Sequence, residues 1–105
     1  MIKVSIFYPS KADGHFDVDY YINTHMPMSI NRLGPTLRGV TVEVGLGGGL
    51  PDSPPPFVAM CHFLFDSVQA FQAAFAPHAA ELVGDIPNYT NIETVIQFSD
   101  VKISQ

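Results

Sequence analysis

The feature that most constrains this chain is the run Phe57–Phe65, in which His62 is the only polar side chain. Nine residues are too few to cross a membrane, and no run of about 18 apolar residues occurs anywhere in the sequence, so this run predicts a buried β-strand. Side chains alternate between two faces along a strand, and here both faces are apolar. Both faces of the sheet around this strand therefore need cover.

The remaining elements place helices on one side of that sheet. Alternating side chains predict further strands over 2–8, 37–44 and 91–98, and apolar stripes predict helices over 18–33 and 68–82. Asp17 caps the first helix, and either Asp66 or Ser67 caps the second. The order β-α-β-β-α-β is typical of a ferredoxin-like α+β sandwich with an antiparallel sheet.

Two prolines fall inside the predicted helices. Pro27 and Pro77 each lie within two residues of a histidine, His25 and His78. Proline removes one helical hydrogen-bond donor and disfavours helical geometry in the preceding residue, so each helix should be interrupted there.

The second face of the sheet has no helix left to cover it, and a second copy of the chain is the simplest source of cover. The 105 residues allow one domain, 1–105, and only 14% of them are charged, against about 25% in typical domains. This composition favours an additional buried surface, and hence a homodimer. Residues 45–56 contain eight Gly or Pro and predict a long loop within the domain.

Several classes of function are excluded or disfavoured. The net charge of −5 argues against a nucleic-acid partner, and the absence of a membrane span and of a signal peptide predicts a cytoplasmic protein. The histidines lack metal-ligand spacing, and the glycines of 45–49 lead into prolines rather than a helix that could hold a phosphate. We therefore expect no metal and no cofactor.

His25 is the first candidate for chemistry, because an imidazole can carry a proton either way near neutral pH. It continues the stripe of Val18, Tyr21 and Ile22, which is expected to face the sheet. The sequence predicts that its ring reaches an apolar pocket between the first helix and the sheet. The alternative is a capping or half-buried structural histidine.

The other candidates are weaker. His78 and Asp85 flank the end of the second helix and could form an acid–base pair or remain surface groups. His62, in an apolar strand, either lines a pocket or is satisfied within the core. Cys61 has no activating base next to it in the sequence and is expected to be an inert packing group. His15 lies in a polar turn and is expected to face solvent.

Four segments of the chain combine into a fairly specific motif: Phe16-Asp17-Val18-Asp19-Tyr20-Tyr21, His25-Met26-Pro27, Phe75-Ala76-Pro77-His78 and Asp85-Ile86-Pro87-Asn88-Tyr89-Thr90. Together they resemble the EthD-like family, over roughly residues 2 to 99. The resemblance implies a dimeric α+β barrel, in which two ferredoxin-like sheets pack face to face, and a link to bacterial degradation pathways, originally of ether compounds. Proteins of this family are often labelled reductases.

Relatives on the same fold include methylmuconolactone isomerases, polyketide cyclases and cofactor-free monooxygenases. The resemblance implies an acid–base histidine at His25, as in the isomerases, and makes Cys61 the candidate match to their strand cysteine. Fold alone does not choose among these reactions.

Two hypotheses follow. The first is a cofactor-free isomerase or oxidoreductase that acts on a small hydrophobic organic compound, with His25 as catalytic acid–base. The second is a non-catalytic protein that binds such a compound in the same pocket. Candidate substrate-contacting residues are Tyr8, Tyr21, His62, His78, Asp85 and Asn88, with Cys61 as a further candidate.

Overall fold

The computed structural model describes residues 1–105 and contains a single four-stranded antiparallel sheet. The strand order is β2-β3-β1-β4, so the chain's first strand and its apolar nine-residue strand occupy the centre. This arrangement confirms the ferredoxin-like α+β fold. The strands are β1 (Ile2–Pro9), β2 (Gly39–Val44), β3 (Phe57–Phe65) and β4 (Val95–Asp100).

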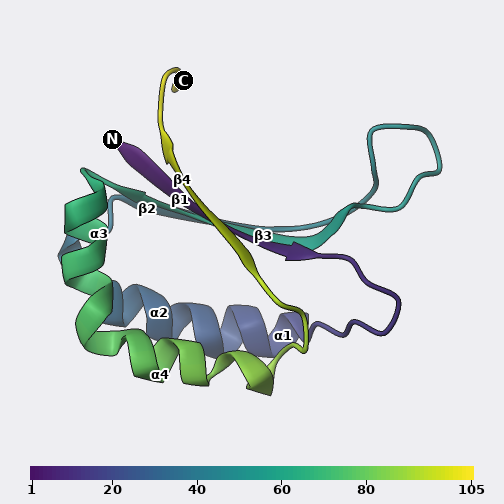
Figure 1. Cartoon of the computed structure of the whole chain (residues 1–105), viewed down its shortest axis with the longest axis horizontal. Coiled ribbons are helices and arrows are strands. Elements are labelled where there is room, and N and C mark those ends of the chain that lie inside the picture. The colour runs from purple at the N-terminus through teal and green to yellow at the C-terminus, as the bar shows by residue number, and fades with distance from the viewer.

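All helical segments cover one face of the sheet, and the long loop between β2 and β3 projects away from them (Figure 1). The first helical stretch comprises α1 (Val18–Tyr20), the π-turn η1 (Tyr21–His25), α2 (Met26–Leu33) and the 3-10 turn η2 (Gly34–Thr36). The second comprises α3 (Val68–Phe75), the 3-10 turn η3 (Ala76–His78), α4 (Ala79–Gly84) and the 3-10 turn η4 (Ile86–Asn88).

The predicted helix caps and interruptions are confirmed. The Asp17 side chain accepts a hydrogen bond from Tyr20 N at 3.1 Å, and of the two candidates for the second cap Ser67 holds the position, accepting from Ala70 N at 3.0 Å. The first helix is interrupted by η1, which ends two residues before Pro27, and the second by η3, which contains Pro77.

The predicted inward stripe of the first helix is partly wrong. Tyr21 and His25 are buried as predicted, but Ile22 is 45% exposed. Consecutive residues are turned about 100° from each other around a helix, so with Tyr21 facing the sheet the side chain of Ile22 lies at the edge of the buried face. The buried face continues through Met26 and Ser29.

Two predicted strand boundaries are corrected. The second strand begins at Gly39 rather than at residue 37, because the Leu37 N–H closes η2 by donating to the Gly34 carbonyl. The last strand begins at Val95 rather than at residue 91. The Asn91 side chain is instead bound to the backbone of the 13–15 loop, which holds this segment away from the ladder.

The two faces of the sheet differ in their cover. Val4 and Tyr8 of β1, with Cys61, Phe63 and Phe65 of β3, point toward the helices and are buried. The opposite face is open in the single chain. There the half-buried Phe7 pairs in register with Met60.

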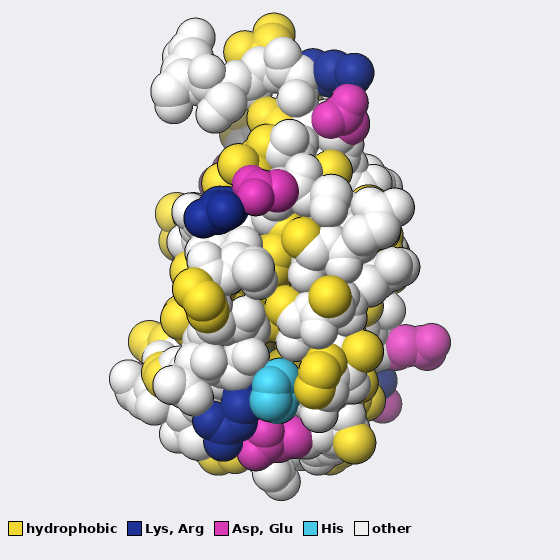
Figure 2. Space-filling model, turned by 90° about the vertical axis from the view of Figure 1, so that its left-hand side faces the viewer, with side chains coloured by type: hydrophobic (Ala, Val, Ile, Leu, Met, Phe, Trp, Pro, Cys, Tyr) yellow, Lys and Arg dark blue, Asp and Glu magenta, His cyan; other side chains and the backbone are white.

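The charged side chains lie mainly at the surface. Basic and acidic groups lie next to each other on the face seen in Figure 2, and the ion pairs include Arg32 with Glu81 and Arg38 with Asp66. None of the helices is long and apolar enough to cross a bilayer.

Candidate active site

A cavity of about 430 Å³ lies between the helices and the covered face of the sheet. Its size is within the range of small-molecule sites, and 15 of its 18 lining residues are hydrophobic. The polar side chains among them are His25, Ser29 and Thr94 and the hydroxyl ends of tyrosines. The lining residues are Val4, Ile6, Tyr8, Tyr21, His25, Met26, Ser29, Leu33, Phe63, Phe71, Phe75, Leu82, Val83, Ile86, Tyr89, Thr94, Ile96 and Phe98.

The π-turn η1 sets the position of His25. Met26 N donates to the carbonyl of Tyr21, five residues back, so this turn is wider than an α-turn. In an α-helix of 3.6 residues per turn, a side chain four positions along points slightly past the direction of the first one. A wider turn reduces this difference in direction. Tyr21 and His25 are thereby aligned, and their rings stack 5.6 Å apart at an angle of 15°.

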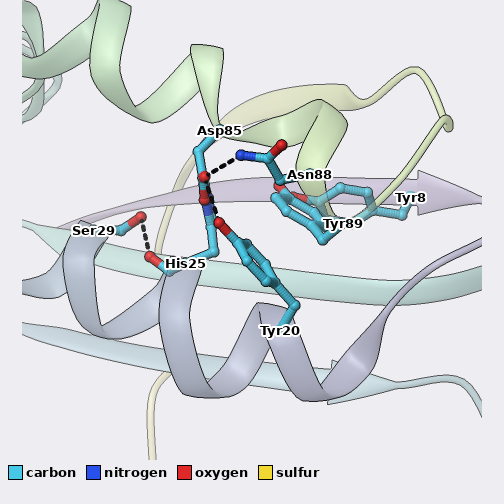
Figure 3. Close-up of polar contacts among 7 residues, drawn as sticks. All are labelled: Tyr8, Tyr20, His25, Ser29, Asp85, Asn88 and Tyr89. Carbon is cyan, nitrogen blue, oxygen red and sulfur yellow. Dashed lines mark hydrogen bonds and ion pairs between the residues drawn. The ribbon is translucent and has the colours of Figure 1, made fainter.

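A carboxylate from the other helical stretch meets His25. The distance from His25 Nδ1 to Asp85 Oδ2 is 2.9 Å, and the two side chains are only 9% and 13% exposed. Figure 3 shows His25 and Tyr20 reaching from the first helical stretch toward Asp85, which follows α4. The two helical stretches therefore build this pair together.

Two further donors hold Asp85. The Tyr20 hydroxyl donates to Asp85 Oδ1 at 2.7 Å, and the Asn88 side-chain amide donates to the same oxygen at 2.9 Å (Figure 3). Burial alone would raise the pKa of Asp85. The hydrogen bonds from Asn88, Tyr20 and His25 outweigh that effect and hold the pKa below its ordinary value, so Asp85 is ionised at neutral pH.

The charge on Asp85 determines which ring nitrogen of His25 is free. A carboxylate only accepts hydrogen bonds, so His25 Nδ1 carries the proton and neutral His25 presents Nε2 as an acceptor. Nε2 of His25 has no hydrogen-bond partner in the chain, whereas every side-chain nitrogen or oxygen that is fully buried from solvent has one. Nε2 is therefore accessible, on a residue that lines the cavity.

A tyrosine cluster forms the polar part of the same wall. The hydroxyls of Tyr8 and Tyr89 are 2.8 Å apart, and the ring of Tyr89 lies 4.6 Å from that of His25. Burial raises the pKa of Tyr8, Tyr21 and Tyr89 above that of a free tyrosine. All three hydroxyls therefore stay protonated at neutral pH and can act as donors.

The structure brings several predicted site residues together. Tyr8, Tyr21 and His25 line the cavity. Asp85 and Asn88 do not line it: Asp85 contacts the lining residue His25, and Asn88 contacts Asp85.

Two predicted histidines lie outside the cavity. His62 is on the open face of the sheet, where Nδ1 lies 2.7 Å from the Ser5 hydroxyl and Nε2 lies 3.0 Å from Glu43 Oε1. His62 therefore does not line a pocket, and although its ring nitrogens have partners, it lies half-buried on the open face and not within the core as the other alternative had it. His78 precedes α4 whereas Asp85 follows it, about 10 Å apart at 1.5 Å per residue, so these two do not pair.

Cys61 is fully buried behind the cavity wall. Its sulfur donates only to Met26 Sδ, at 4.0 Å, and burial raises the pKa of the thiol to about 12. It is not among the lining residues. These surroundings favour the thiol form, which is a poor nucleophile.

Sequence reasoning did not assign roles to Tyr20 and Tyr89. Both belong to segments that carry the family resemblance, and that was the only available signal. No spacing rule predicts that Tyr20 meets Asp85, 65 residues away. The chain contains no group of three or more His, Cys, Asp or Glu side chains able to hold a metal ion.

Fold and site together define a small α+β protein in which a His–Asp pair and a tyrosine cluster border an apolar cavity. The EthD domain profile matches residues 13–93. An EthD-like protein from Ralstonia eutropha JMP134 is 47% identical, over 99% of this chain and 94% of that one, with a TM-score of 0.94. The chain therefore belongs to the EthD family.

More distant structures share the fold alone. An ethyl tert-butyl ether D (EthD) family protein from Bacillus halodurans C-125 is 20% identical over 97% of this chain and 99% of that one, with a TM-score of 0.74. SnoaB, a cofactor-independent oxygenase from Streptomyces nogalater, is 13% identical over 98% and 93%, with a TM-score of 0.55. No curated protein matches the chain.

Proposed function

We propose that this protein is an enzyme that moves a proton within a small hydrophobic organic compound, using side chains alone, with His25 as the acid–base group. One observation carries the proposal: the 2.9 Å contact of His25 Nδ1 with an ionised Asp85, which leaves Nε2 free at an apolar cavity. A histidine with this arrangement is a base held in one tautomer and one orientation.

The proposed reaction begins with transfer of a substrate proton to His25 Nε2. The imidazolium that forms shares its charge with Asp85, 2.9 Å away, which stabilises it in an apolar setting. His25 then returns the proton to a different substrate atom, so the net change is an isomerisation that needs no co-reactant. An oxygenase reaction would begin with the same deprotonation and would consume dioxygen.

The test is proton exchange in D₂O. Neutral ketones and lactones are incubated with the protein, and loss of the signal from the acidic C–H is followed by NMR. The wild type should accelerate exchange of at least one compound, and His25→Ala should reduce that acceleration by about 10²-fold or more. His15→Ala, at an exposed histidine, is the matched control and should have no effect.

A binding protein is the second candidate, and the apolar lining favours it, since such a cavity would hold a hydrophobic molecule without any chemistry. The same experiment separates the two. The decisive result is a compound that binds in the cavity but exchanges its proton only at the rate seen in buffer, with the wild type and with His25→Ala. That result would contradict the enzyme hypothesis and support the binding-protein hypothesis.

We also propose that two copies associate through the open face of the sheet. The helices cover only the other face (Figure 1), while Phe7, Met60 and Leu64 are left half-buried on this one. Light scattering should give the mass of a dimer, and Leu64→Glu should shift it toward the monomer. A wild-type monomer at micromolar concentration would refute this.

Location in the cytoplasm and a role in a catabolic route stay predictions.

A further inference from the structure

We propose that the ligand of this cavity is an uncharged compound that carries one hydrogen-bond-accepting oxygen, and that the Tyr8–Tyr89 hydroxyl pair binds this oxygen beside His25. The inference rests on the proposed function in that the ligand occupies the same cavity. It adds the chemical class of the ligand and the residues that select it.

The charge of the ligand follows from what lines the cavity. No lysine or arginine is among the lining residues, and the nearby Arg32 is already paired with Glu81 at 2.8 Å. His25, if protonated, already has Asp85 as its counterion. A carboxylate or phosphate entering this cavity would lose its hydration and find no free cation, which is strongly unfavourable.

That the ligand carries an accepting oxygen is inferred from the number of hydroxyl protons in the tyrosine pair. The hydroxyls of Tyr8 and Tyr89 carry two protons, and the 2.8 Å hydrogen bond between them uses one. The Tyr21 hydroxyl beside Tyr8 brings a proton of its own, so the cluster still has one proton left for an acceptor from outside. Tyr8 and Tyr89 are 98–99% buried there, and both line the cavity. A ligand with no oxygen would leave this donor unsatisfied.

The two polar features also lie next to each other. The rings of Tyr89 and His25 are 4.6 Å apart and inclined at 49°, so one small molecule can contact both (Figure 3). A carbonyl oxygen at the tyrosine pair would place its α-carbon near the base. The hydrogen bond would then strengthen as negative charge develops on that oxygen during proton removal.

Three probes of one size test the ligand class. They are 2-tetralone, which is neutral with one carbonyl, tetralin, which lacks the oxygen, and tetralin-2-carboxylate, which is an anion. Titration calorimetry of the wild type should show 2-tetralone binding about 5- to 10-fold more tightly than tetralin. The carboxylate should bind at least about 100-fold more weakly than the ketone.

The triple variant Tyr8→Phe/Tyr21→Phe/Tyr89→Phe nearly conserves side-chain volume and removes all three hydroxyls of the cluster, so it should bring the ketone affinity down to that of tetralin. Thr94→Val removes another hydroxyl from the lining and is the matched control, in which the preference for the ketone should persist. Tyr89→Phe alone should already reduce the preference if the triple variant does not fold.

Each contrary result has one meaning. Equal affinity of the wild type for 2-tetralone and tetralin overturns the tyrosine assignment, and so does loss of the preference in Thr94→Val instead of the tyrosine variants. Binding of the carboxylate as tightly as the ketone, or no binding of either neutral probe, overturns the uncharged ligand class. The proposed function fails on a separate readout, namely exchange that His25→Ala does not change.

Discussion

Replacing Asp85 with asparagine tests the site most directly, because it keeps the shape of the side chain and removes its charge. Asp85 accepts three hydrogen bonds, from Tyr20, Asn88 and His25, at 2.7, 2.9 and 2.9 Å. An amide has one accepting oxygen. If that oxygen keeps Tyr20 and Asn88, the amide nitrogen faces His25 Nδ1, and two donors meet unless His25 moves its proton to Nε2.

The variant should therefore lose both stability and catalysis. A hydrogen bond to a charged group contributes about 1.5–3 kcal/mol to the free energy of unfolding, and one between neutral groups about 1 kcal/mol. Part of this difference is offset, because the variant no longer has to remove a charged carboxylate from water. We expect a loss of about 2 kcal/mol, which lowers the Tm of a domain of this size by roughly 8–16 °C. With Nε2 protonated, His25 cannot accept a proton, so exchange should fall about 10²–10⁴-fold.

The pH dependence has a definite sign. The pKa of Asp85 is lowered in the folded protein, so its stabilisation is fully present above the unfolded value of about 3.9 and is lost as pH falls through the lower folded value. The part of the stability difference between the wild type and Asp85→Asn that comes from the charge of Asp85 should thus shrink as the pH falls below about 4.

Urea unfolding at several pH values measures the stability, and the ¹⁵N shifts of the imidazole report the tautomer. In the wild type Nδ1 should carry the proton of the neutral ring, and in Asp85→Asn Nε2 should carry it. The reasoning is refuted if the variant keeps the wild-type tautomer, or if its stability lies within about 0.5 kcal/mol of the wild type at pH 7.

Three further predictions concern single positions. Tyr20→Phe removes one donor from Asp85 and should raise the pKa of Asp85, which the pH dependence of its carboxyl ¹³C shift would measure; an unchanged pKa would contradict the positioning role. Cys61, buried and with a pKa of about 12, should resist iodoacetamide at pH 8 in the folded protein and react in urea, as mass spectrometry would show; rapid labelling of the folded protein would count against it. Gly45→Ala should destabilise by about 1–3 kcal/mol in urea unfolding, because its new methyl group would press on the Phe57 carbonyl oxygen, whereas Gly49→Ala meets nothing within 4 Å and should be near neutral. Equal stability of the two glycine variants would rule out the steric argument.

Much of the fold could be predicted, because it depends on local patterns. The apolar run of β3 and the positions of Pro27 and Pro77 are features of neighbouring residues in the sequence, and the structure agrees with the strand and the two helix interruptions that they predict. The start of β4 was placed four residues early because the competing hydrogen bonds of Asn91 reach to a loop nearly 80 residues away. Such long-range competition leaves no periodic signal.

The site is predictable in part, because Tyr8, Tyr21 and His25 are candidates from the sequence and line the cavity. His25 stands out because it combines a titratable ring with a helix interruption and a family motif. For Asp85 the sequence offers a pairing with His78, its nearer neighbour along the chain, or a place at the surface, whereas the structure pairs it with His25. His62 was open to two interpretations, and its partners Ser5 and Glu43 come from neighbouring strands.

The alternation of strands and helices, the cap at Asp17 and the apolar character of both faces of β3 can be derived from the amino-acid sequence, since each depends on residues a few positions apart. Which polar groups meet depends on the packing of the helices on the sheet. The contacts of Asp85 with Tyr20 and His25 span 65 and 60 residues, and that of Tyr8 with Tyr89 spans 81. Such pairs form because helix packing on the sheet brings distant segments within 3 Å, and a hydrogen bond requires that distance, not proximity along the chain.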